Sequence, residues 1–263
     1  MTTRTLISPS KASRQSLDVP IKVVQRDIPN QCKIEKHSHE WGQFIYASQG
    51  VMLVKTPHHH YIVPPEQGVW LLPHIDHEVQ SLTPVSLTSF YIATEMLGHM
   101  PKECGVLDVS VFLKVLIDEA RYFSNDYTWE DNQGLHLRLI VQTLSRAPSA
   151  VFQLPFPTDK RLVKMLDAIQ RAPANNYSLE QWGKIVGASS RTLSRLFKKE
   201  TGLNYTEWRQ RLTIQIAIGK LIGGDSIANI AHELGYHSPS AFTHMFKNKA
   251  GMTPSFFNKN ATQ

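Results

Sequence analysis

The hydrophobic residues of this 263-residue chain follow two different periods. From about residue 21 to residue 95, short runs rich in β-branched and aromatic residues alternate with Pro and Gly, a pattern typical of an antiparallel β-barrel or sandwich. The clearest predicted strands cover residues 21–25, 43–48, 51–55, 61–63 and 86–91. The first twenty residues are polar and aperiodic, so they predict a flexible arm before the first strand.

A helical period begins at Asp108 and continues to Phe123, and a second helical run covers residues 135–146. The sequence leaves two interpretations of this pair open: the helices cover the barrel, or they form a dimer interface. The candidate contacts of such an interface are Val111, Val115, Leu135 and Leu139. Residues 147–157 contain three prolines and no periodicity, which indicates a linker.

Beyond this linker the pattern is helical throughout and contains an internal repeat. The segment L-x-x-W-G-x-x-V-G at residues 179–187 matches I-x-x-I-A-x-x-L-G at residues 227–235, an offset of 48. The segment S-S-R-T-L-S-R-L-F-K-K-E-T-G at residues 189–202 matches S-P-S-A-F-T-H-M-F-K-N-K-A-G at residues 238–251, an offset of 49. Such a repeat indicates two copies of one supersecondary unit.

Each copy has the parts that a helix-turn-helix unit requires. The first helix carries an inward apolar stripe, and Gly183 is small enough to let the next helix cross closely. Gly187 and Gly235 stand where a helix ends in a left-handed residue. Ser189 and Ser238 can cap the second helix of each copy.

The second helix of each copy turns a polar and basic side outward. The outward residues are Arg191, Ser194, Arg195 and Lys198 in the first copy, and Ser240, Thr243, His244 and Lys247 in the second. Short polar and Arg side chains on such a helix can reach base edges in the DNA major groove, whereas Lys suits phosphate. The run between the copies, residues 205–222, spans ~27 Å as a helix, which approaches the ~34 Å repeat of B-DNA once the width of the two units is added. The period of this run places Arg209 and Arg211 on its outer side. The alternative is a bundle of amphipathic hairpins without a DNA partner.

The charge distribution favours a polyanionic partner for the C-terminal half. Residues 1–150 carry 13 Lys and Arg against 15 Asp and Glu, a net charge of −2, whereas residues 151–263 carry 15 against 7, a net charge of +8. Cys32 and Cys104 are the only cysteines, which suits a reducing compartment. No run has the length of a signal peptide or a transmembrane helix, so we expect a cytoplasmic protein without a membrane partner.

The repeated motifs resemble the AraC/XylS family of bacterial transcription regulators. The resemblance covers residues 158–257 and rests on S-x-x-L-S-R-L-F-K-K-E-T-G at residues 190–202, A-x-x-L-G-Y at residues 231–236 and F-x-x-x-F-K-N-K-A-G-M-T-P at residues 242–254. It implies two helix-turn-helix units joined by a long helix. The implied base-facing residues are Arg191, Ser194 and Arg195 in the first recognition helix, and Ser240, Thr243 and His244 in the second. His244 departs from the Arg that is common in relatives.

The N-terminal half contains His37-x-His39-x-x-x-Gln43, then Gly50 and a later His77, which resembles the cupin pattern. Residues 37, 39 and 43 have the parity of one strand face. Three histidines could bind Zn, Fe or Ni, but Gln43 stands where cupins have Glu, so no metal or other cofactor is assigned. The alternative is an organic effector, or mutual hydrogen bonding. The residues assigned to the effector site are His37, His39, Gln43, His77, Trp41, Tyr46 and Trp70, and the tract His58–His60 is interpreted as a polar turn.

Together these features predict an α+β chain with a cupin-like antiparallel β-barrel and a helical pair, followed by an all-α module of two helix-turn-helix units. The expected divisions are an arm (1–20), a sensing and dimerisation domain (21–146), a linker (147–157) and a DNA-binding domain (158–263). We expect a sequence-specific activator or repressor whose partners are double-stranded DNA, a small-molecule effector, RNA polymerase and, in one alternative, a second copy. Two other hypotheses are a metal-dependent oxygenase or isomerase tethered to DNA, and a nonspecific architectural DNA binder.

Overall fold

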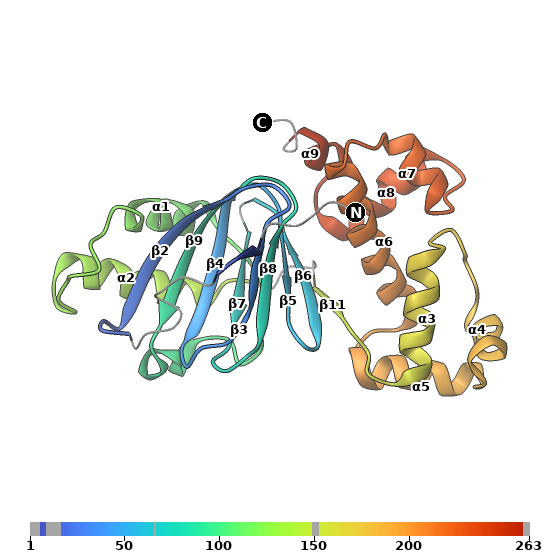
Figure 1. The fold of residues 1–263 in the computed structure, drawn as a ribbon, viewed down its shortest axis with the longest axis horizontal. Coiled ribbons are helices and arrows are strands. Elements are labelled where there is room, and N and C mark those ends of the chain that lie inside the picture. The colour runs from blue at the N-terminus through green and yellow to red at the C-terminus, as the bar shows by residue number, and fades with distance from the viewer. Residues whose placement is uncertain (1–5, 9–16, 66, 149–152, 260–263) are drawn as a thin grey trace. The chain divides into compact units, whose positions relative to one another are not determined.

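The computed structural model describes residues 6–8, 17–65, 67–148 and 153–259 (Figure 1). The chain divides into two compact units. Residues up to 57 and from 61 to 150 form the N-terminal unit, and residues 58–60 and 151–263 form the C-terminal unit. Most of the expected flexible arm lies outside the described residues, although Leu6–Ile7 forms β1, which pairs in parallel with β3 (Lys33–His37).

Two β-sheets build the N-terminal unit. The strands of one sheet are, in spatial order, β10 (Gly105–Asp108), β7 (Gln67–Leu71), β4 (Gly42–Gln49), β9 (Val85–Ile92) and β2 (Ile21–Ile28). The strands of the other sheet in this unit are, in order, β1, β3, β8 (His77–Ser81), β5 (Met52–Lys55) and β6 (His59–Val63). Neighbouring strands of the first sheet run antiparallel throughout. The α+β class with a cupin-like N-terminal sheet structure is confirmed.

Strand β4 shows how this sheet divides its side chains. Successive residues of a strand point to opposite faces. Phe44 and Tyr46 therefore lie on one face, in the hydrophobic core under the helices, whereas Gln43 and Ile45 lie on the other face and line a cavity. Gly68 of the adjacent β7 must lack a side chain, because a Cβ there would lie 2.2 Å from the Phe44 ring.

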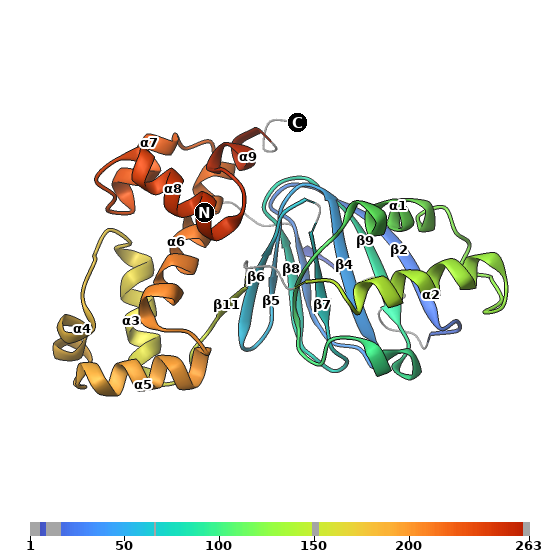
Figure 2. The ribbon, with the colours of Figure 1, turned by 180° about the vertical axis from the view of Figure 1, so that it is seen from behind.

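Helices α1 (Val111–Ala120) and α2 (Asn132–Leu144) cover the outer face of this sheet, in front of it in the view of Figure 2. Their buried residues join the core that contains Trp70 and Phe90. The connection between the helices also provides hydrogen-bond partners for the backbone of β2, the strand at the edge of this sheet. The Tyr127 hydroxyl and the Asn125 amide each form hydrogen bonds with backbone N–H and C=O groups of β2. A short 3-10 helix, η2 (Thr94–His99), follows β9.

The C-terminal unit is helical after β11 (Gln153–Pro155). Its helices are α3 (Lys160–Arg171), α4 (Leu179–Val186), α5 (Ser190–Thr201), α6 (Tyr205–Ile222), α7 (Ile227–Glu233), α8 (Pro239–Ala250) and α9 (Pro254–Lys259). The core of its first half is built around Trp182, Phe197 and Trp208, which are each about 1% exposed. The α6 bounds are those that the hydrophobic period predicts.

Capping fixes where α5 and α8 begin and end. The Ser189 hydroxyl accepts the Thr192 N–H at the start of α5, and the Ser238 hydroxyl does the same for Ala241 at the start of α8. Gly187 adopts φ 70° directly after α4, and Gly235 adopts φ 79° after α7. These contacts set the turn of each helix-turn-helix unit.

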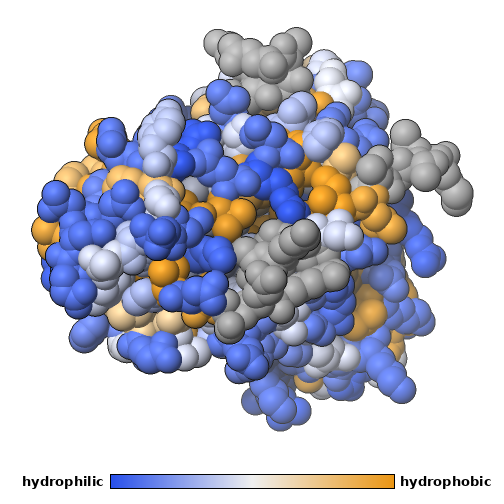
Figure 3. All heavy atoms as spheres, turned by 60° about the vertical axis from the view of Figure 1, so that its left-hand side comes forward, coloured by the Kyte–Doolittle hydropathy of each residue, from blue (hydrophilic) through white to orange (hydrophobic). Residues whose placement is uncertain are grey.

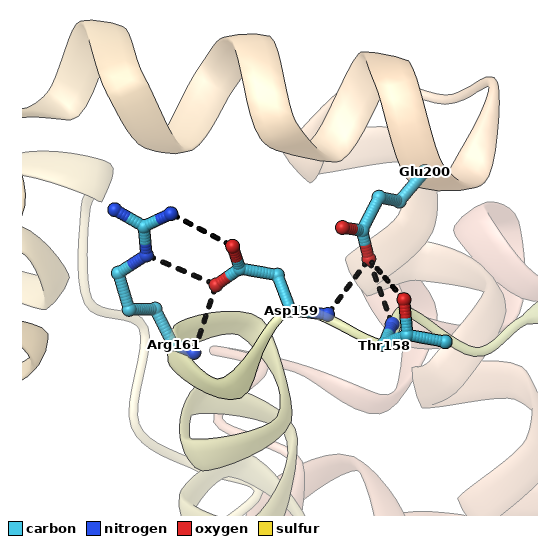
Figure 4. A network of polar contacts seen from close by, with 4 residues as sticks. All are labelled: Thr158, Asp159, Arg161 and Glu200. Carbon is cyan, nitrogen blue, oxygen red and sulfur yellow. Dashed lines mark hydrogen bonds and ion pairs between the residues drawn. The ribbon is translucent and has the colours of Figure 1, made fainter.

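The start of α3 is tied to the end of α5 by a polar network (Figure 4). The Glu200 carboxylate accepts the backbone N–H groups of Thr158 at 2.7 Å and Asp159 at 2.9 Å. Asp159 in turn accepts two hydrogen bonds from the Arg161 guanidinium, which holds the pKa of this carboxyl at about 2. The charged network therefore positions the start of α3 against α5.

The end of the expected linker is packed. Residues 149–152 lie outside the described residues, but Leu154 is fully buried, and the Trp208 indole N–H donates to the Pro155 carbonyl at 2.8 Å. The sequence shows no period over these residues, because a three-residue strand is too short to display one.

Candidate functional site

Helix α5 presents a basic surface. Leu193 and Phe197 are buried, which turns Arg191, Ser194 and Arg195 outward, and all three are exposed. Lys198 is also exposed, although its ammonium donates to the Gly202 carbonyl at 2.9 Å across the end of the helix. The structure therefore brings the four predicted residues of this helix to one accessible surface.

Helix α8 presents a similar, less basic surface. Phe242 and Phe246 are fully buried, while Ser240, His244 and Lys247 are exposed and Thr243 is half-buried. The His244 ring lies 3.2 Å from the Asn248 amide nitrogen, one turn further along. This contact links the His244 imidazole to the Asn248 side chain on the exposed surface of the helix.

One basic residue of α6 lies opposite to its expected position. The period predicts an outward Arg209, yet its side chain is only 9% exposed and donates to the Pro173 and Asn175 carbonyls. Burial lowers the pKa of its guanidinium. Arg209 cannot contact DNA in this arrangement, because it holds the α3–α4 connection against the long helix.

Three histidines converge in the N-terminal unit. The ring centroids of His37 and His77 lie 4.3 Å apart, and those of His39 and His77 lie 5.1 Å apart. One ring nitrogen of each lies within 4.8 Å of the others. Residues 37, 39 and 43 do not share one strand as their parity suggests: His37 ends β3, His39 lies in the connection to β4, and Gln43 lies in β4. His77 begins β8.

Backbone carbonyls fix the protonation of the three rings. Nδ1 lies 2.8 Å from the Glu35 oxygen in His37, 2.9 Å from the Trp41 oxygen in His39, and 2.9 Å from the Ile75 oxygen in His77. A carbonyl only accepts, so in a neutral ring the proton lies on Nδ1 and the lone pair on Nε2. The spacing of the histidines in the sequence carries no sign of these carbonyl partners.

Burial keeps the inner two rings neutral. Burial lowers the pKa of His77 to about 3, and the nearby His37 lowers it further. Burial also lowers the pKa of His39, against the opposing effect of its contact with Gln43. The Gln43 Oε1 atom lies 2.9 Å from Nε2 of His39, and the Gln43 NH₂ group donates to the Ser89 hydroxyl at 3.1 Å.

A small cavity lies beside these rings. It has a volume of about 20 Å³ and is lined by both sheets, including His37, Gln43 and His77. An organic ligand of ordinary size needs roughly 300–1,000 Å³. This cavity has room for about one water molecule or ion.

The interpretation of two aromatic residues as pocket walls is wrong. Tyr46 and Trp70 lie in the core under α1 and α2, and the Trp70 indole donates to the Pro101 carbonyl. Strand β4 is buried on both faces, so its composition could not show which residues face the cavity. Trp41 does lie by the cluster, stacked on His39 with an interplanar angle of 4°. Sequence reasoning missed Tyr91, which lines the cavity from β9.

The predicted polar turn at His58–His60 is also wrong in part, since His59 and His60 begin β6. Three consecutive histidines lack the alternation of apolar and polar residues that predicts a strand. Strand formation here depends on pairing with neighbouring strands, which the local sequence does not show.

The outer surface of α1 and α2 is apolar. Val111 is 82% exposed, Val115 57%, Leu135 59% and Leu139 39%. A hollow of about 320 Å³ lies between the two helices. Figure 3 shows hydrophobic patches between hydrophilic residues on the side of the molecule that is turned forward in that view. The helices thus cover the sheet and also leave apolar side chains outside.

Comparison with known proteins defines the class. Residues 23–147 match the AraC-like ligand binding domain, and residues 182–260 match a helix-turn-helix domain. The HTH-type transcriptional regulator NimR of Escherichia coli (strain K12) is 31% identical over 218 residues, which cover 83% of this chain and 80% of NimR. RipA of Corynebacterium glutamicum is 34% identical over 103 residues, 39% of this chain and 31% of RipA. A structure of ToxT from Vibrio cholerae covers 93% of this chain and 100% of its own at 12% identity, with a TM-score of 0.41.

The matched domains and the paired helix-turn-helix units define a DNA-binding transcription regulator with a ligand-binding domain. The chain belongs to the AraC family of HTH-type transcriptional regulators. Among the helices of the described residues, none combines the length and the apolar character needed to cross a membrane.

Proposed function

We propose that α5 and α8 read the bases of two neighbouring major-groove segments of one operator. The observation that carries this proposal is the shared architecture of the two helices, each capped by Ser, with aromatic residues buried and polar or basic residues exposed. Arg191, Ser194 and Arg195 on α5, and Ser240, Thr243 and His244 on α8, are the proposed base-reading residues. Lys198 and Lys247 are the proposed phosphate contacts.

Selection from a randomised duplex pool, followed by binding assays at rising salt, tests this function. Specific base contacts should keep the enriched duplex bound at salt concentrations that dissociate random DNA, because the phosphate contribution falls with salt for both. Equal affinity for enriched and random duplexes at every salt concentration would indicate an architectural DNA binder instead.

We infer further that ligand binding at the histidine cluster changes the affinity for DNA. The match to a ligand-binding domain and the convergence of His37, His39, His77 and Gln43 support this assignment. The proposed activity is binding rather than turnover, and it takes place in the cytoplasm. The proposed regulation acts through RNA polymerase, and transcription in vitro from a promoter that carries the enriched sequence tests it. A His37→Ala variant should lose the ligand response while the chain still binds its operator; an unchanged response would contradict the assignment.

The exposed apolar surface of α1 and α2 supports a homodimer. Val115→Glu should shift the chain toward monomer in sedimentation, because a charge in an apolar interface is costly. Tyr122→Glu is the control, since Tyr122 is 87% exposed and lies after α1, outside the proposed contacts. A monomeric wild-type chain at working concentration would contradict the dimer.

A further inference from the structure

We propose that His37, His39 and His77 form a binding site for one divalent transition-metal ion, such as Zn²⁺. The site deepens the proposed ligand response, because it names the chemical class of the ligand. Imidazole nitrogen is a preferred ligand of zinc, and three protein ligands with one open position are typical of sites that exchange a fourth ligand.

The positions of the rings suit such an ion. In a tetrahedral zinc site, nitrogens at about 2.05 Å from the metal lie about 3.3 Å from one another. The three nitrogens lie within 4.8 Å of one another here. Side-chain rotations that move each nitrogen by about 1 Å are sufficient to close the site around an ion.

The hydrogen bonds also prepare the rings for a metal. Each Nδ1 donates to a backbone carbonyl, the arrangement that commonly orients metal-binding histidines. His77 is 1% exposed, and its buried Nε2 has no hydrogen-bond partner among the described residues. A buried polar atom without a partner is destabilising, and a bound ion removes that cost.

Gln43 is compatible with this site. Because Nδ1 of His39 donates to the Trp41 carbonyl, its Nε2 carries a lone pair, and this lone pair faces the Gln43 Oε1 atom, which is also an acceptor. The amide can turn to present its NH₂ group to that lone pair, or release it to an ion. Ser89 holds the amide in either orientation, since its hydroxyl both donates and accepts.

The size of the cavity favours an ion over an organic effector as the ligand. A volume of about 20 Å³ admits about one ion or water, and it is more than tenfold smaller than an ordinary ligand pocket. The absence of a carboxylate gives a neutral ligand set, and imidazole suits Zn, Cu, Ni and Fe rather than Mg or Ca.

The test uses the full chain, stripped with a chelator and titrated with Zn²⁺ by calorimetry and with Co²⁺ by absorption spectroscopy. We expect one ion per chain and cobalt bands of nitrogen ligation. His37→Gln and His77→Gln should each weaken binding at least ~10-fold, the loss that even indirect partners of metal ligands produce. His59→Gln is the matched control, because the tract at residues 58–60 is the obvious adventitious site, and it should bind as the wild type does.

Circular dichroism checks the fold of each variant. If His77→Gln does not fold, His37→Gln decides the outcome, since His37 is only half-buried. Absence of a bound ion in the wild type, unchanged affinity in folded His37→Gln, or loss of binding only in His59→Gln would overturn the proposal. Binding of the stripped chain to the enriched duplex is measured separately, so failure of the metal site and failure of DNA reading are distinguishable.

Discussion

Replacing Arg195 by Ala tests base reading by the first helix-turn-helix unit. Arg195 is exposed on α5 and forms no ion pair among the described residues, so its removal should change the free energy of unfolding by no more than about 0.5 kcal/mol. A bidentate contact from Arg to guanine contributes about 1–3 kcal/mol of discrimination. Affinity for the enriched duplex should therefore fall about 5- to 150-fold.

Fluorescence anisotropy with the enriched duplex, single-position variants of it and random DNA measures this change. The variant should lose its preference at one base pair and keep most of its affinity for random DNA. Arg171→Ala is the matched control, because Arg171 is an exposed residue of α3 outside the proposed interface. An equal loss on enriched and random DNA would mean that Arg195 contacts phosphate, and no loss at all would refute its place in the interface.

Three further changes test other parts of the account. Lys247→Ala should weaken binding to all sequences alike and reduce the salt slope by about 1, as loss of a phosphate contact does; a sequence-selective loss would contradict this role. Glu200→Ala should lower the free energy of unfolding by about 1 kcal/mol in chemical denaturation, because two backbone N–H groups lose a charged acceptor. A change of less than about 0.5 kcal/mol would mean that water replaces the carboxylate as their hydrogen-bond acceptor without loss of stability. Gln43→Glu should tighten Zn²⁺ binding in calorimetry by adding a carboxylate beside His39, and unchanged affinity would exclude Gln43 from the edge of the metal site.

The C-terminal unit was the more predictable half. Its helix ends are set by local groups, such as the Ser189 and Ser238 caps and the left-handed Gly187, and its cores by a helical period that the sequence displays directly. Arg209 is the exception, because its burial depends on carbonyls about 35 residues away in the sequence.

The N-terminal unit was less predictable for physical reasons. Strand β3 (Lys33–His37) and strand β8 (His77–Ser81) are polar, and β7 (Gln67–Leu71) is buried on both faces, so none shows the alternation of a half-buried strand. The histidines could be identified by type, but their convergence depends on the pairing of β3 with β8 and on backbone carbonyls. The sequence could not place Tyr46 on the correct face of β4, because that strand is buried on both faces.

A methylation-interference footprint of the full chain on the enriched duplex tests the central claim most directly. Two helix-turn-helix units on one duplex predict two groups of major-groove guanine contacts, with centres about 10 base pairs apart. Substitution of Arg195 should erase contacts in one group and leave the other in place. A single group of contacts, or uniform protection without base-specific interference, would contradict the proposal that α5 and α8 read one operator together.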